Sequence, residues 1–213
     1  MKNLKTIMAA GTCLVLLPVS AFAETRDYDV GDFSRIKVAQ GIEANVRIGE
    51  SISVSAQGPD GKMDKLDISV QGDELVIRRK RNRSWGWNSD SSNFEVTITA
   101  ISLSSIDVSS GADVSVTGLN EQSVSLDASS GASMDVAGVC ESLSADASSG
   151  SRISADNLQC KQVSADVSSG AAIDVYASDR FTGDASSGGD IDVFGNPEQV
   201  STDESSGGDI DLR

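Results

Sequence analysis

The stretch SLDASSGASMDV, residues 125–136, contains the motif that decides the fold of this chain. Its centre, Asp-x-Ser-Ser-Gly, occurs six times in the second half of the sequence, at steps of 18 to 20 residues. The motifs end at Gly111, Gly131, Gly150, Gly170, Gly188 and Gly207. A repeat of this length is typical of a solenoid, in which each unit buries its apolar face only against its neighbours.

Residues within one unit alternate as they do in a β-strand. In the quoted stretch one side carries Leu126, Ala128, Ser130, Ala132, Met134 and Val136. In the third unit the same side carries Ala145, Ala147, Ser149 and Ser151, so the expected core is narrow. We therefore interpret residues 104–213 as a right-handed parallel β-helix of about six coils, roughly 29 Å long at ~4.8 Å per coil.

The residues before the repeat also alternate, but they lack the Ser-Ser-Gly motif. Residues 32–101 contain several short alternating runs, with glycine turns at Gly49-Glu50 and Gly72-Asp73. Such runs predict antiparallel strands, and no segment carries a convincing helical stripe. The expected fold is all-β, with an N-terminal antiparallel β-sheet portion continuous with the β-helix.

The first 23 residues have the order of a secretory signal peptide. Lys2 and Lys5 precede an apolar run over residues 7–19, and Ala21-Phe22-Ala23 supplies a small-residue cleavage site. The run is too short to span a membrane, and nothing later in the chain is long and apolar enough. We expect cleavage before Glu24 and a periplasmic or secreted product with no membrane span.

The predicted mature chain is strongly acidic. Without Lys2 and Lys5, 15 basic residues face 32 acidic ones, a net charge of −17. This balance argues against nucleic acid as a partner and is compatible with bound cations.

The order of the sequence blocks resembles the putative auto-transporter adhesin, head GIN domain family of bacterial exported proteins. The resemblance runs from FSRIKVAQGIEANVRIGESISVSAQG (33–58) through LDISVQGDELVIRRK (66–80) and the coils to GNPEQVSTDESSGGDIDLR (195–213). It covers nearly all of residues 24–213, and it implies an adhesin-like β-helical domain of the cell envelope. The chain departs from the family pattern at Glu43, where members often carry Asp or Asn, and at the coil corners, where many use Ser-Gly-Gly-Ser-Asp.

An enzymatic function is disfavoured by the residue types present. The chain has no histidine, which removes Ser-His and Cys-His nucleophile pairs, and it has no Gly-x-Ser-x-Gly motif. Ser34-Arg35-Ile36-Lys37 matches Ser-x-x-Lys, but without companion motifs and on an alternating strand. Short coils leave no insertion from which to build a glycosidase cleft. We predict a protein that is not an enzyme.

One aspartate precedes each coil glycine by four residues. These residues are Asp107, Asp127, Asp146, Asp166, Asp184 and Asp203. If the coils are in register, the carboxylates stack at ~5 Å and repel one another. We expect mainly hydrogen bonds from unpaired corner amides to offset this repulsion. The alternative is a metal site, for which calcium is the suitable cation because it prefers oxygen ligands.

A second aspartate set follows the glycine by four residues and consists of Asp135, Asp174, Asp192 and Asp211. Cys140 and Cys160 occupy equivalent places on adjacent coils, and in an oxidising compartment we expect them to form a disulfide.

The segment RRKRNRSWGWNSDSSN, residues 78–93, is the other unusual feature. Arg81, Arg83, Trp85 and Trp87 combine charge with the only two tryptophans, so the segment is a candidate for binding sugars or acidic polymers. The alternative is structural: a charged strand end and hairpin tip, or a lid over the first coil.

Together these features predict a non-enzymatic, adhesin-like binding module whose partner is a surface glycan or protein. The competing interpretation is a structural or calcium-responsive envelope protein in which the acidic coils matter most. The last coil ends at Arg213 without a cap, so its edge is free to pair with a second copy as a homodimer.

Overall fold

A computed structural model of the chain describes residues 23–80 and 92–213. The predicted signal peptide lies outside this part of the chain except for Ala23, so it stays a prediction. The described residues form strands and one 3-10 turn, Met63–Lys65. None of the helical structure in these two ranges is long and apolar enough to cross a membrane. The all-β prediction is confirmed.

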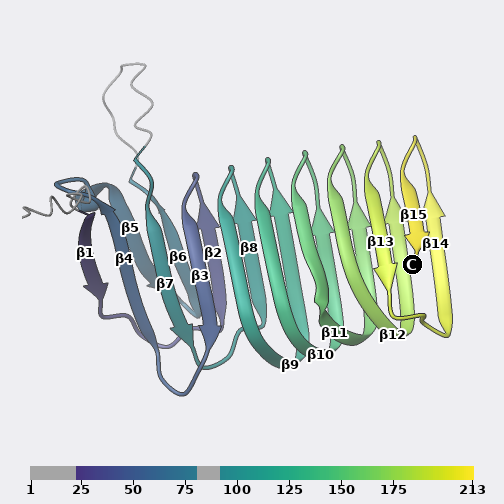
Figure 1. Ribbon diagram of the computed structural model, residues 1–213, viewed down its shortest axis with the longest axis horizontal. Helices are drawn as coiled ribbons and strands as arrows, with labels where there is room; N and C mark the ends of the chain where they lie inside the picture. Colours follow the sequence, from purple (N-terminus) through teal and green to yellow (C-terminus); the bar gives the residue numbers. More distant parts are fainter. Residues whose placement is uncertain (1–22, 81–91) are drawn as a thin grey trace, which may run out of the picture.

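The second half of the chain is a parallel β-solenoid of about five turns, close to the six coils expected (Figure 1). Its strands are β8 (Ser105–Ser109), β9 (Asp113–Ser129), β10 (Ser133–Ala147), β11 (Arg152–Val167), β12 (Ala172–Ala185), β13 (Asp190–Phe194), β14 (Gln199–Glu204) and β15 (Asp209–Leu212). Each of the long strands β9 to β12 runs along one sheet, curves, and returns along the other sheet. One strand therefore supplies most of a coil.

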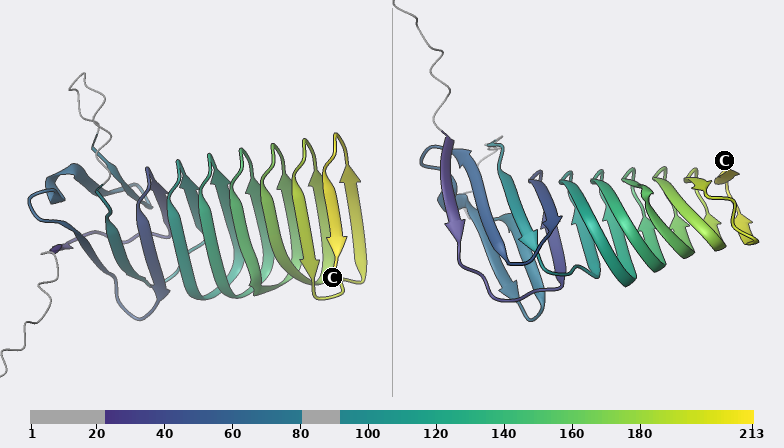
Figure 2. Two further views of the ribbon diagram at one scale, coloured as in Figure 1. Left: turned by 45° about the horizontal axis from the view of Figure 1, so that its top comes forward. Right: turned by 60° about the horizontal axis from the view of Figure 1, so that its bottom comes forward.

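The coils therefore have two different edges, which lie on opposite sides of the stack (Figures 1 and 2). At the corner edge, the chain reverses sharply at the Ser-Gly pairs of the repeat. At the bend edge, the long strands curve through residues 118–122, 137–141, 157–161 and 176–178. Both sheets stack their coils in parallel, as the pairings of Leu126 with Ala145 and of Ala145 with Ala165 illustrate.

The N-terminal portion contains seven strands, and the expected antiparallel pairing is present. The strands are β1 (Ala23–Tyr28), β2 (Arg35–Ala39), β3 (Glu43–Ile48), β4 (Ser53–Pro59), β5 (Leu66–Gln71), β6 (Glu74–Arg79) and β7 (Glu95–Ala100). β1 pairs antiparallel with β4, β4 with β7, and β5 with β6.

The solenoid nevertheless begins earlier than the expected start at residue 104. β2 pairs parallel with β6 and β8, and β3 pairs parallel with β7 and β9, so β2 and β3 already form a coil. Its corner is Gln40-Gly41, with φ of 69° and 63°, and the amide of Gly41 donates to the carbonyl of Ser110 on the next corner. The sequence motif missed this coil because Lys37, Ala39 and Gln40 replace the aspartate and the two serines, so only the glycine remains.

Each corner of the repeat is a two-residue reversal with positive φ at both central positions. In the second coil Ser130 has φ of 56° and Gly131 has φ of 70°, and the Ala132 amide donates to the Ser129 carbonyl (3.2 Å). Such a turn follows the twist of the adjoining strands. The Gly131 amide donates to the carbonyl of Ser149 on the next coil (3.1 Å), so the corners form their own ladder.

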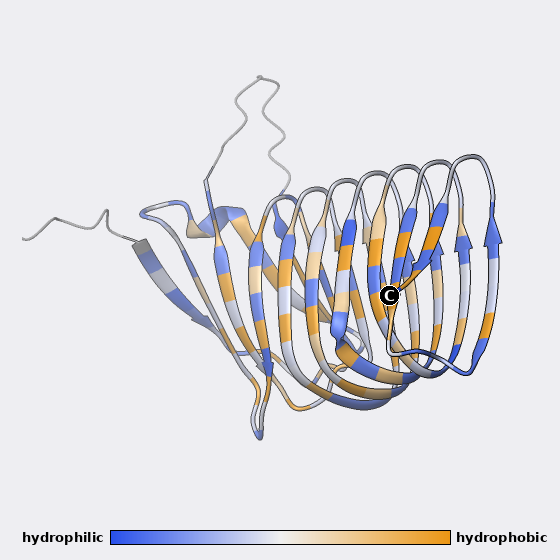
Figure 3. Ribbon diagram, turned by 45° about the vertical axis from the view of Figure 1, so that its right-hand side comes forward, coloured by the Kyte–Doolittle hydropathy of each residue, from blue (hydrophilic) through white to orange (hydrophobic). Residues whose placement is uncertain are grey.

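The core is narrow, as the alternation predicted. Leu126, Ala128, Met134 and Val136 are buried, and apolar and polar residues alternate along the strands (Figure 3). The prediction was wrong for Ser130 and its equivalent Ser149, which are exposed. The positive φ of the corner residues breaks the strand alternation at that point, so their side chains leave the core face.

Candidate binding surfaces

The six predicted aspartates form one column along the outer face of the second sheet. The pairings run from Asp107 to Asp127, Asp146, Asp166, Asp184 and Asp203, one step per coil. A hollow of about 260 Å³ lies over the middle of this column and is lined by Asp127, Asp146, Asp166, Ser148 and Ser168 with their neighbours. The column is therefore in register, as the repeat implied.

A lysine that the repeat did not reveal stands at the head of the column. Lys37, on β2, pairs in register with Asp107, and its ammonium donates to the Asp107 carboxylate. This hydrogen bond raises the pKa of Lys37. Lys37 was hidden from the motif search because its coil lacks Ser-Ser-Gly.

Within the part of the chain that the structure describes, Asp127 and Asp146 form no ion pair like that of Lys37 with Asp107. Burial raises the pKa of Asp127, and the charge of Asp107 raises it further, against a smaller opposing effect of Lys37. Burial also raises the pKa of Asp146, as do the charges of Asp166 and Asp127. Carboxylate charge is thus disfavoured at Asp127 and at Asp146.

The expected hydrogen bonds from corner amides to these carboxylates do not form. In the described residues the amide of Gly131 is bound by a carbonyl of the next coil, as are those of Gly111, Gly150 and Gly170. The parallel ladder therefore already satisfies the amides that the aspartates were expected to cap. Among residues 23–80 and 92–213, no group of three or more His, Cys, Asp or Glu side chains is arranged to hold a metal ion.

The basic aromatic residues Arg81, Arg83, Trp85 and Trp87 lie outside the described residues. The strands β6 and β7 lie on either side of these residues. β6 pairs parallel with β2, and β7 pairs parallel with β3, so the two strands add to the coil that β2 and β3 form. The end of β6 and the start of β7 therefore lie where strands of later coils meet a Ser-Gly corner.

Arg79, at the end of β6, binds both Ser92 and the neighbouring corner at Gln40-Gly41. Its guanidinium donates to the carbonyls of Gln40 (2.7 Å), Gly41 (3.2 Å) and Ser92 (2.6 Å), and it lies 5.1 Å from the centre of the Phe94 ring. Burial lowers the pKa of Arg79. These contacts hold Arg79 and Ser92, described residues on either side of the tryptophan segment, next to this corner.

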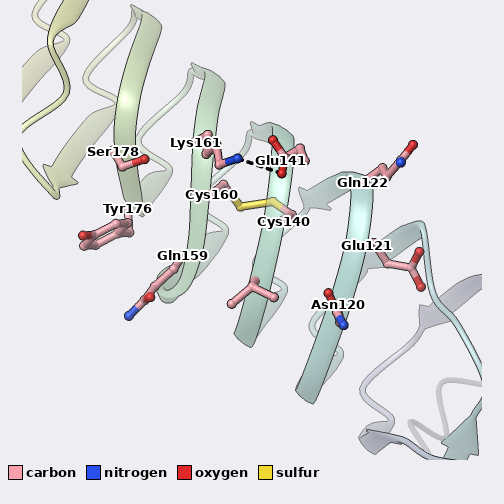
Figure 4. Close-up of a pocket in the computed structure, with 11 residues that line it drawn as sticks. Asn120, Glu121, Gln122, Cys140, Glu141, Gln159, Cys160, Lys161, Tyr176 and Ser178 are labelled. Atoms are coloured by element: carbon pink, nitrogen blue, oxygen red, sulfur yellow. Dashed lines mark hydrogen bonds and ion pairs between the residues drawn. A yellow bond between two sulfur atoms is a disulfide. The ribbon is translucent and has the colours of Figure 1, made fainter.

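The two cysteines of the predicted mature chain form a disulfide on the bend edge. Cys140 and Cys160 pair in register on β10 and β11, with a Cα–Cα separation of 4.5 Å. Both are nearly buried, and the bond joins two consecutive coils at the floor of a groove (Figure 4).

This groove has a volume of about 490 Å³ and crosses four coils. Its lining comprises Asn120, Glu121, Gln122, Val139, Cys140, Glu141, Gln159, Cys160, Lys161, Tyr176 and Ser178. Lys161 and Glu141 form an ion pair across adjacent coils (2.9 Å), and Glu121 accepts a hydrogen bond from the amide of Leu103 (3.2 Å). The volume falls in the usual range for small-molecule sites.

One row along the bend edge holds a different side chain in each of five coils, and its first four members line the groove. In register, this row runs Asn120, Val139, Gln159, Tyr176 and Phe194. Val139 is 46% exposed, and the rings of Tyr176 and Phe194 are half-buried. We call these five residues the bend row.

Sequence reasoning missed the bend row, although the sequence contained a signal for it. The steps between glycines vary from 18 to 20 residues, and the structure absorbs this variation at the bend edge. Register shifts occur between Asp135 and Gly138 on β10 and between Ala155 and Gln159 on β11. The irregular spacing of the coil glycines thus indicated that one part of each coil, the bend edge, varies in length and is not constrained by the repeat.

A match to a protein-family model identifies the family of this chain. The family described as "Putative auto-transporter adhesin, head GIN domain" matches residues 32–197. The chain belongs to this family. The head GIN match includes the early coil of β2 and β3, the antiparallel pairs β4–β7 and β5–β6, and the solenoid up to Pro197. No curated protein matches the chain.

Solved structures similar to this head GIN domain include the following three. A putative adhesin from Bacteroides fragilis has a TM-score of 0.68 at 18% identity, over 90% of this chain and 97% of its own. A putative adhesin from Parabacteroides merdae has a TM-score of 0.56 at 16% identity, over 88% and 95%. A putative lipid binding protein from Parabacteroides distasonis has a TM-score of 0.50 at 17% identity, over 88% and 95%. At these identities the likeness shows a shared fold.

Proposed function

We propose that this head GIN domain is an exported, non-enzymatic, adhesin-like module that binds its ligand in the groove of the bend edge. The observation that carries the proposal is the bend row, where five successive coils present five different side chains. Specific recognition requires side chains that differ from one coil to the next and that are held in place by a rigid backbone. Strands provide such a support better than loops do.

Several features of the groove support binding rather than catalysis. Its ionisable pair, Lys161 and Glu141, is exposed and hydrogen-bonded internally, which is typical of a surface ion pair. The chain has no histidine to act as a base beside a serine or cysteine, and the two groove cysteines are joined. The names of the family and of its structural neighbours are consistent with an adhesive role. We place the protein in the periplasm or outside the cell because of its signal-like N-terminus.

The test is retention on cell surfaces. Fluorescent protein comprising residues 24–213, oxidised, is incubated with bacterial and epithelial cells and counted by flow cytometry. We expect Tyr176→Ala combined with Gln159→Ala to reduce retention at least tenfold. The matched control is Gln57→Ala on β4, an exposed amide far from the groove, which should leave retention unchanged.

The same assay separates the groove from the tryptophan segment. If Trp85→Ala with Trp87→Ala abolishes retention and the groove variant does not, the proposed site is wrong and the segment held by Arg79 carries the binding. That segment remains a second proposed contact surface, with Arg81 and Arg83 as its basic residues.

A second function, as a calcium-responsive envelope protein, is favoured only by the in-register aspartate column. A ligand that binds the folded state raises the melting temperature by mass action. Calcium at millimolar concentration would therefore raise the melting temperature by many degrees relative to EDTA, and Asp127→Ala with Asp146→Ala would remove the rise. An unchanged melt excludes this alternative.

A further inference from the structure

We infer that the bend row binds a linear, uncharged polysaccharide that runs along the solenoid axis with one sugar unit on each coil. This inference rests on the proposed function, because it specifies the ligand of the same groove. The argument depends on the spacing, the side-chain chemistry and the charge of the row.

The spacing of the row suits an extended sugar chain. Successive members lie one coil apart, ~4.8 Å, so Asn120 and Phe194 are separated by about 19 Å over four steps. A pyranose in an extended polysaccharide advances by a similar length. An extended peptide rises only ~3.3 Å per residue and would lose register with the coils. The row therefore matches the repeat of a glycan better than that of a peptide.

Two aromatic rings stand next to each other at one end of the row. Tyr176 and Phe194 pair in register, and Figure 4 shows the ring of Tyr176 at the end of the groove. The ring of Tyr176 lies against Gly195, where an added Cβ would be 3.0 Å from the ring. Half-buried rings offer flat apolar faces with little conformational freedom to lose, and the C–H face of a pyranose can pack on such a surface.

Amide side chains occupy two other positions of the row and one position beside it. Asn120, Gln122 and Gln159 line the groove, and within the described parts of the chain their side chains make no hydrogen bonds. A carboxamide offers both donors and an acceptor, which suits sugar hydroxyls that do both. Because the coils fix the spacing of these amides, a glycan would meet them already positioned.

The charge of the groove selects an uncharged ligand. Glu121 and Glu141 lie in the lining, and Lys161, the basic residue of the lining, is paired with Glu141. The whole chain has a net charge of −15. Acidic polysaccharides and nucleic acid would therefore be repelled, and a neutral glycan carries no such penalty.

The experiment is titration calorimetry of residues 24–213, oxidised, with cello- and chito-oligosaccharides of two, four and six units. Because the row spans five coils, we expect affinity to rise at least tenfold from the disaccharide to the hexasaccharide. Hyaluronan, an anionic polysaccharide, should not bind. Tyr176→Ala should lower hexasaccharide affinity at least tenfold, Tyr176→Phe should lower it much less, and Gln57→Ala should leave it unchanged.

The inference is overturned if no uncharged oligosaccharide binds, if affinity does not depend on length, or if Tyr176→Ala binds normally while circular dichroism shows it folded. Retention on cells through the groove without oligosaccharide binding would refute the glycan and leave the proposed function standing, with a peptide or protein as the ligand. Oligosaccharide binding without retention on any cell would refute the adhesive function instead.

Discussion

The two edges of the same coils follow different rules. At the corner edge every coil of the repeat has the same pair, a serine with φ of 50–56° and a glycine with φ of 68–80°, and the corner amides of the first four coils bond to the next coil. At the bend edge the coils differ in length, register and side chains. The repeat therefore fixes the fold at one edge, and this constraint leaves the other edge free to vary.

The glycines of the two edges are required for different reasons. Gly131, at a corner, has φ of 70° and open space where a Cβ would lie. Gly138, at the bend, would place a Cβ 2.2 Å from the carbonyl oxygen of Leu119 on the preceding coil. Gly131 needs only an unusual backbone conformation, whereas Gly138, with φ of 151°, needs both an unusual conformation and the absence of a side chain.

The largest effect should come from Gly138→Ala. Relief of the backbone overlap requires two coils to separate beside the disulfide, so we expect a loss of at least ~3 kcal/mol in the free energy of unfolding. Urea unfolding followed by circular dichroism measures it. A loss below that of Gly131→Ala would contradict the assignment of close packing to the bend edge.

A smaller effect is expected for Gly131→Ala. The new methyl group meets no neighbour, so the cost is that of holding an alanine at positive φ, about 1–2 kcal/mol. The same unfolding experiment applies, with Gly150→Ala as a replicate because its conformation and surroundings are equivalent. Unequal losses at these two corners would show that the corners are not equivalent.

The smallest effect concerns the aspartate column. The pKa of Asp146 is raised in the folded chain, so its contribution to stability is greatest below the unfolded pKa of ~3.9 and is lost as the pH rises through the folded pKa. Asp146→Asn should therefore raise the melting temperature slightly at pH 7.

That gain should shrink as the pH falls, because the raised pKa makes Asp146 take up its proton at a higher pH in the folded chain than in the unfolded chain. Calorimetric melts of both proteins at pH 7 and at successively lower pH, in EDTA, measure the difference. A variant that melts lower than the parent at pH 7 would mean that the carboxylate is stabilised by a partner.

The sequence predicted the repeated part of the molecule well because the repeat directly encodes its corners. Asp127 and Asp146 stack as their spacing implied, and Cys140 and Cys160 meet because they share a register. Gln40-Gly41 forms an equivalent corner without the motif. The backbone has a similar conformation there, but the residues differ, so a search for the repeated motif could not find this corner.

The candidate site was harder to predict for a physical reason. Asn120 and Tyr176 are 56 residues apart, and their alignment in one row depends on register shifts at Gly138 and Gln159 that no local pattern encodes. Lys37 escaped notice because its partner, Asp107, lies on the next coil of the sheet but 70 residues along the chain.

The disulfide also has a mechanical consequence. The hydrogen bonds between coils run along the solenoid axis, so a force on the C-terminal end peels the coils away one after another. Unravelling reaches Cys160 and then meets a covalent bond to Cys140, 20 residues earlier. The length of chain enclosed by the bond, roughly 70 Å when extended, cannot be drawn out under tension until the disulfide is reduced. The groove lies across this bond, so the candidate binding surface includes the two coils that the disulfide holds together under tension.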